Sequence, residues 1–188
     1  EVIALNYENG FVPPFFEGTH WGLPIPEDTR EGLQTGFADP DTYGTDGRAV
    51  IYHMAYFSAK QFGAGQFYLI NISDRAGKPL DGNKTYRLTV PPNAPIEQYW
   101  SATAYDRETH ALIRGMPRPS LASNDTTVQK NPDGSVDIYF GPKAPAGKES
   151  NWVPTDPKRQ FELLFRLYGP KKELFEKTWK LSDVEKVK

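Results

Sequence analysis

Cysteine is absent from the sequence, and the other side chains that bind metals or react with oxidants are scarce. The chain has 188 residues, with no Cys, two Met and three His. Without a thiol it can form no disulfide, no cysteine nucleophile and no metal site with cysteine ligands. The histidines, His20, His53 and His110, are far apart and lack the short spacings of local metal sites. We therefore predict neither a metal nor a cofactor.

Long apolar runs and an excess of positive charge are also missing. The chain has 22 Lys and Arg against 24 Asp and Glu, which gives a formal net charge of −2. A nucleic-acid-binding surface requires clustered positive charge, and no basic run of that density occurs. No apolar stretch approaches the roughly 18 residues that a membrane-spanning helix needs. We therefore predict no nucleic-acid partner and no membrane span.

Residues 1–64 differ in pattern from the rest of the chain. The sequence starts at Glu1 without a methionine, and we expect it to be part of a longer protein. Prolines exclude long regular elements from residues 1–45, yet the rings of Phe15, Phe16 and Trp21 make this segment too apolar for a free tail. We predict an extended arm whose rings are covered, so that the chain self-associates or contacts a missing N-terminal module.

A helix is predicted near the end of this region. Thr45-Asp46-Gly47 can cap a helix at about residues 48–60, in which apolar side chains occur nearly all round. The β-favouring run Val50-Ile51-Tyr52 leaves a strand as the alternative.

From residue 65 onward, short strands alternate with turn residues. We predict strands at residues 66–73, 85–90, 98–106, 127–130, 135–140 and 161–168. Asn131-Pro132-Asp133-Gly134 predicts a hairpin that joins the fourth and fifth of these strands. A short helix is expected from Pro170 to about Trp179, followed by a polar tail at residues 181–188. This pattern predicts a mainly β fold, a jelly-roll-like antiparallel β-sandwich with an early helix and a short C-terminal helix.

The strand at residues 98–106 is predicted to have two different faces. Because side chains alternate along a strand, Trp100, Ala102 and Ala104 share one face and are expected to pack in the core. The opposite face carries two tyrosines and two hydroxyl residues, Tyr99, Ser101, Thr103 and Tyr105. Either the strand is interior and these hydroxyl groups form hydrogen bonds with nearby groups, or this face lines a cleft that contains water.

Five motifs after residue 65 resemble those of a known family. They are Asp81-Gly82 with Tyr86-Arg87-Leu88, Tyr99 to Asp106, Asn131 to Val136, Asn151-Trp152-Val153-Pro154, and Phe165 to Pro170. In this order they resemble the domain of unknown function 1214. The resemblance covers about residues 65–188, which we take as the β-sandwich domain. Residues 1–64 are then the arm, linker and helix at the end of a preceding module.

The resemblance implies a setting but no reaction. Domains of this family follow a partner module, the domain of unknown function 1254, in larger and mostly bacterial proteins that are often exported. It therefore implies a jelly-roll-like β domain in a periplasmic or secreted parent protein. It implies no catalytic residue.

An enzyme is the alternative to a binding or structural domain. A catalytic triad can be written from Ser101, His110 and Asp106, but a triad is defined by geometry that the sequence does not fix. We therefore assign no catalytic residue. A hydrolase whose active site is shared with a missing N-terminal domain is the alternative function.

Arg166 is the candidate ligand-binding residue, because it lies between apolar neighbours on the strand predicted at residues 161–168. A guanidinium group there must be paired or must face a polar cavity, since its burial alone is too costly. The structural interpretation pairs it with Glu162 or Asp106. In the functional interpretation, the planar guanidinium group of Arg166 binds an anionic or hydroxylated ligand.

The functional interpretation also predicts neighbours for Arg166. Tyr105 and Tyr99 would line the same cleft, and Trp152 would lie at its mouth. Arginine, tyrosine and tryptophan together combine charge, hydrogen bonding and stacking. We therefore predict a small polar, sugar-like or glycan ligand for the domain.

Overall fold

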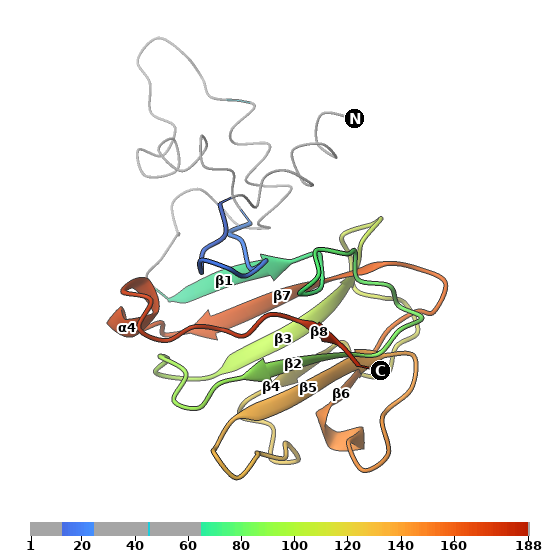
Figure 1. Ribbon diagram of the computed structural model, residues 1–188. Coiled ribbons are helices and arrows are strands. Elements are labelled where there is room, and N and C mark those ends of the chain that lie inside the picture. Colours follow the sequence, from blue (N-terminus) through green and yellow to red (C-terminus); the bar gives the residue numbers. More distant parts are fainter. Residues whose placement is uncertain (1–12, 25–44, 46–64, 188) are drawn as a thin grey trace.

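Two four-stranded β-sheets dominate the part of the chain that the computed structural model describes, residues 13–24, 45 and 65–187 (Figure 1). The first sheet has the strand order β1-β7-β3-β4 and the second β6-β5-β2-β8. The first comprises β1 (Gln66–Asn71), β7 (Phe161–Tyr168), β3 (Trp100–Asp106) and β4 (Ser120–Ala122). The second comprises β6 (Trp152–Pro154), β5 (Val136–Gly141), β2 (Tyr86–Val90) and β8 (Glu185–Lys186). Neighbouring strands are antiparallel except β5 and β6.

Side chains of alternate residues fill the space between the sheets. On β3, Trp100, Ala102 and Ala104 are buried in the core as predicted. Trp100 stacks on Phe165 of the neighbouring β7, with ring centroids 5.5 Å apart. The second sheet contributes the inward residues of β5 and β2, which are all buried: Val136, Ile138, Phe140, Tyr86, Leu88 and Val90. The predicted mainly β sandwich is therefore confirmed.

Residues 13–24 add aromatic rings to this core. Gly22 exchanges two backbone hydrogen bonds with Ile70 of β1, each 2.9 Å long. This contact holds the segment along the edge of the first sheet, where Phe16 and Trp21 are buried and Phe15 is partly buried. The predicted covering is therefore confirmed for Phe16 and Trp21 and holds in part for Phe15, and the core of this chain supplies it. Self-association and contact with a missing module stay predictions. The remaining arm and the helix predicted at residues 48–60 lie outside the described residues.

The C-terminal segment corrects two predictions. The helix expected up to Trp179 is a single turn, α4 (Lys172–Phe175). The polar tail predicted at residues 181–188 is wrong, because Leu181 and Val184 are fully buried and β8 pairs with β2. These two apolar residues, three positions apart, are buried in the core, although most residues of the segment are polar. No helix of the described residues is long and apolar enough to cross a membrane.

The turn at residues 131–134 forms as predicted, but the hairpin does not. The Gly134 N–H donates to the Asn131 carbonyl at 2.9 Å. Residues 127–130 form no strand, and β5 pairs instead with β2 and β6. The backbone of Gln129 is satisfied by the side chain of Asn151, which comes from the 3-10 helix η1 (Glu149–Asn151). The side chain of Asn151 therefore forms the backbone hydrogen bonds that were predicted to come from a neighbouring strand.

The backbone of Gly134 provides a stability test of this turn. Gly134 has φ +85°, and a Cβ added there would meet the nearest atom at an ordinary contact distance of 3.5 Å. Gly134→Val should therefore destabilise the fold through backbone strain alone, by roughly 1 kcal/mol or more. Gly134→Asn is the matched control, because asparagine tolerates this conformation better. Equal stability of both variants and the parent in urea unfolding would contradict the turn.

Candidate functional site

The outer face of the first sheet carries a cluster of polar and aromatic side chains around Arg166. On β7 the outward residues alternate with core residues, and β1 and β3 lie on either side of β7 (Figure 1). The strand register places Tyr68 of β1 and Ser101 of β3 directly opposite Arg166. Arg166 is half-buried, as are Tyr68 and Tyr105. We call Arg166 with these tyrosines, Thr103 and the pair Tyr99–Tyr168 the outer-face cluster.

Hydroxyl groups and aromatic faces hold the guanidinium of Arg166. Its Nη1 donates to Thr103 Oγ1 at 2.9 Å, and its Nη2 donates to the Tyr105 hydroxyl at 2.5 Å. The guanidinium carbon lies 5.5 Å from the ring centroid of Tyr68 and 5.6 Å from that of Tyr105, which is within cation–π range. The predicted proximity of Arg166 and Tyr105 is therefore present.

The carboxylates proposed as partners of Arg166 are engaged elsewhere. Glu162 lies 3.1 Å from His110 and 3.6 Å from Arg107, whereas Asp106 pairs with Arg159. The other described arginines that are half-buried each form an ion pair with a carboxylate: Arg87, Arg107, Arg118 and Arg159. Among the half-buried arginines that the structure describes, Arg166 alone has hydroxyl partners in place of a carboxylate.

Two tyrosines of the cluster, Tyr68 and Tyr168, have pKa values above the usual value. Tyr99 and Tyr168 stack with ring centroids 4.2 Å apart. Burial raises the pKa of Tyr68 above its usual value, and the opposing effect of Arg166 is smaller. Burial, together with the hydrogen bond to Tyr99, likewise raises the pKa of Tyr168. These phenols therefore keep their protons and can donate hydrogen bonds to a ligand.

Two differences from the sequence prediction concern which residues join the cluster. Trp152 lies on β6 of the other sheet, where its Nε1 donates to the Gly141 carbonyl at 2.9 Å, so it is not at the mouth of this site. Tyr68 belongs to the cluster but was missed, because its place depends on the pairing of β1 with β7. Tyr168 could be placed in the cluster from the sequence, because it lies two residues after Arg166 and therefore on the same face of the strand.

A buried carboxylate and a histidine lie beside the cluster. Glu162 is 3% exposed and is opposite Tyr105 in the strand register. Its two oxygens lie 3.1 and 3.2 Å from His110 Nδ1. His110 has φ +53°, a conformation that is uncommon for residues other than glycine. The geometry is that of a histidine oriented by a carboxylate.

The triad of Ser101, His110 and Asp106 is not assembled. His110 pairs with Glu162, and Asp106 instead accepts hydrogen bonds from the loop that follows β3 and from Arg159. Within residues 13–24 and 65–187, no group of three or more histidine and carboxylate side chains is placed to hold a metal ion.

Comparisons with known proteins identify a family and a shared fold. The family described as "Protein of unknown function (DUF1214)" matches residues 65–172. The chain resembles the crystal structure of the VPA0106 protein from Vibrio parahaemolyticus, with 22% identity and a TM-score of 0.59 over 86% of this chain and 42% of that one. An uncharacterized protein from Burkholderia cenocepacia matches with 20% identity and a TM-score of 0.45 over 98% of this chain and 52% of that one. No curated protein matches the chain.

The environment of Asp106 predicts how stability depends on pH. Burial alone would raise the pKa of this carboxyl group, but the hydrogen bonds from Thr109 and Arg159 outweigh it, so the pKa lies below its usual value. Such a group stabilises the fold above its unfolded pKa of about 3.9, and this contribution is lost as the pH falls through the lower, folded pKa. The melting temperature should therefore fall on acidification below about pH 5.

Asp106→Asn should have a lower melting temperature than the parent at pH 7. Its melting temperature should fall less on acidification, because one of the titrating carboxyl groups is gone. The control is Glu173→Gln, which removes one carboxylate at an exposed position of α4. Parallel melting curves for the Asp106→Asn variant and the parent between pH 7 and pH 2.5 would contradict this assignment.

Proposed function

The chain belongs to the DUF1214 family, and we propose that its β-sandwich binds a small polar, sugar-like ligand with an anionic group at the outer-face cluster. One observation carries this proposal: among the described residues, the positive charge of Arg166 meets hydroxyl groups and ring faces in place of a carboxylate. The parent protein is proposed to be exported and to hold this domain behind an N-terminal module, as the family resemblance implies.

The charge of Arg166 favours an anionic ligand. A half-buried cation without a counter-charge loses part of its hydration and regains little from neutral partners. A guanidinium group has five N–H donors in a planar fork that matches a carboxylate. Thr103 and Tyr105 hold the fork in place, so a ligand carboxylate would meet an arginine that is already oriented.

The tyrosines favour a ligand that is also hydroxylated and has a flat apolar face. Tyrosine offers an apolar ring and a polar tip, which suits a sugar ring with C–H groups on one face and hydroxyl groups at its edge. The stacked pair Tyr99–Tyr168 and the ring of Tyr68 provide such surfaces next to Arg166. A sugar acid combines the two chemical features that the cluster would recognise.

Arg166→Met tests this site. The variant should lose at least tenfold in affinity for the ligands that the parent binds from a panel of monosaccharides, sugar acids and simple carboxylates, as measured by calorimetry. Melting temperatures are measured in parallel. Arg118→Met is the matched control, because Arg118 pairs with Asp125 and the Ser150 carbonyl and is outside the cluster. If the Arg166 variant melts earlier but no panel member distinguishes it from the parent, the arginine is structural.

A hydrolase is the second candidate, and the pair His110–Glu162 favours it. A buried carboxylate on Nδ1 orients the imidazole and makes Nε2 its basic nitrogen, as general base catalysis requires. The pair lies next to Tyr105, which contacts Arg166, so that a ligand at the cluster would be near it. In this case the active site would be completed by the preceding part of the parent protein.

His110→Gln in the full parent protein tests the second candidate. Turnover of nitrophenyl esters and nitrophenyl glycosides should fall at least 100-fold, which is the lower end of the usual contribution of a general base. The control is His20→Gln, at a histidine that pairs with Asp183. Absence of turnover in the parent, or equal turnover in the His110 variant, would exclude this candidate.

A further inference from the structure

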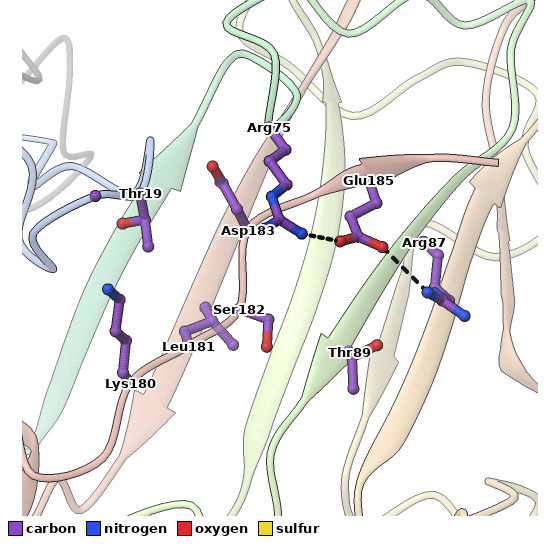
Figure 2. A pocket seen from close by; sticks show the side chains of 10 residues that line it. Thr19, Arg75, Arg87, Thr89, Lys180, Leu181, Ser182, Asp183 and Glu185 are labelled. Carbon is purple, nitrogen blue, oxygen red and sulfur yellow. Dashed lines mark hydrogen bonds and ion pairs between the residues drawn. The ribbon is translucent and has the colours of Figure 1, made fainter.

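A second polar site is a cavity of about 500 Å³ beside the outward residues of β2 (Figure 2). Three parts of the chain meet there: the segment at residues 13–24, the outward face of β2 with the loop after β1, and the C-terminal segment. The lining consists of Gly18, Thr19, Arg75, Arg87, Thr89, Lys180, Leu181, Ser182, Asp183 and Glu185. A volume of this size is within the usual range for small-molecule sites.

Among the residues that the structure describes, three cationic side chains line this cavity. Glu185 lies between two of them, with Oε1 2.6 Å from Arg75 Nη1 and Oε2 3.1 Å from Arg87 Nη2, as Figure 2 shows. The third cation, Lys180, donates its Nζ to the Glu17 carbonyl and has no carboxylate partner among the described residues. Its ammonium group lies over Gly18, where a Cβ would be 3.9 Å from Nζ.

The second carboxylate of the lining is engaged by other groups. Asp183 Oδ2 lies 2.6 Å from His20 Nδ1, and Asp183 Oδ1 accepts a hydrogen bond from Asn71 Nδ2 at 3.2 Å. Neither His20 nor Asn71 lines the cavity. Glu185 is therefore the carboxylate that both arginines share, so each arginine has a direct counter-charge. Lys180 is the lining cation without a carboxylate partner among the described residues, and the described lining has three cations against two carboxylates.

We propose that this cavity binds a small phosphorylated anion that is rich in hydroxyl groups, of the size of a sugar phosphate. A phosphate monoester carries close to two negative charges at neutral pH, which suits a described lining that has one more cation than carboxylates and a lysine without a carboxylate partner. Lysine and arginine are the side chains that bind phosphate best, the first as a point charge and the second as a fork. Ser182, Thr19 and Asp183 provide polar partners for hydroxyl groups, and the lining residues that the structure describes include no aromatic ring.

A ligand in this position would also join the two ends of the described chain. Trp21 Nε1 already donates to the Ser182 carbonyl at 2.8 Å, so the segments on either side of the cavity are in contact. A sugar phosphate that contacts both Lys180 and Arg87 adds a further link between the C-terminal segment and the body of the sandwich. Because the ligand binds the folded state, its binding should raise the melting temperature.

Titration of the full chain with glucose 6-phosphate, inorganic phosphate and glucose tests the proposal. Glucose 6-phosphate should bind saturably and raise the melting temperature, inorganic phosphate should bind more weakly, and glucose should not bind. Lys180→Met and Arg87→Met should each weaken the binding of glucose 6-phosphate at least tenfold. Lys172→Met, in a surface pair with Glu176, should leave it unchanged.

The outcomes separate this site from the outer-face cluster. Arg166→Met should leave the binding of glucose 6-phosphate unchanged, because Arg166 does not line the cavity. In the parent, Lys180 donates to the Glu17 carbonyl and pairs with no carboxylate among the described residues, so we expect Lys180→Met to fold. This variant therefore decides between the outcomes if the Arg87 variant is unstable. No saturable binding of glucose 6-phosphate, equal affinity in the Lys180 variant, or the same loss in the Lys172 control would overturn the proposal.

Discussion

The two-residue period of β7 determines both the core and the outer-face cluster. The inward residues of this strand, Phe161, Leu163, Phe165 and Leu167, are all buried between the sheets. Its outward residues are Glu162, Leu164, Arg166 and Tyr168, so the core side chains and the candidate site share one backbone. A slip of one residue would exchange the two sets and place a guanidinium group in the core. The packing of four large apolar side chains therefore holds Arg166 in place, because the strand cannot shift without losing their burial.

Local sequence signals predicted the elements whose structure depends on neighbouring residues. The faces of β3, the whole of β7 and the positive φ of Gly134 follow from alternation and turn chemistry. The failures involve partners far apart in the chain. Asn151 satisfies the backbone of Gln129, which was predicted to lie in a strand. Pairing of that kind has no signature in the residues of either segment alone.

In the candidate site, too, part of the arrangement was predicted from the sequence and part was not. Arg166 and Tyr105 were predicted together, and they are in contact. Their proposed carboxylate partners were wrong because the loop after β3 brings His110 to Glu162, and Arg159 reaches Asp106 from another loop. Which of several carboxylates pairs with a given arginine is decided by loop conformation, which alternation along a strand does not predict. Tyr68 was missed for a related reason, since its neighbour is known only when β1 is placed beside β7.

The two proposed sites differ in how they depend on the rest of the chain. All residues of the outer-face cluster are within the range that matches the family, residues 65–172. The cavity takes Gly18 and Thr19 from before that range and residues 180–183 and 185 from after it. These flanking segments also contribute Phe16, Trp21, Leu181 and Val184 to the core. Changes in the flanking segments would therefore reshape the cavity and part of the core, whereas the arginine and hydroxyl contacts of the cluster rest on the strands of the first sheet alone.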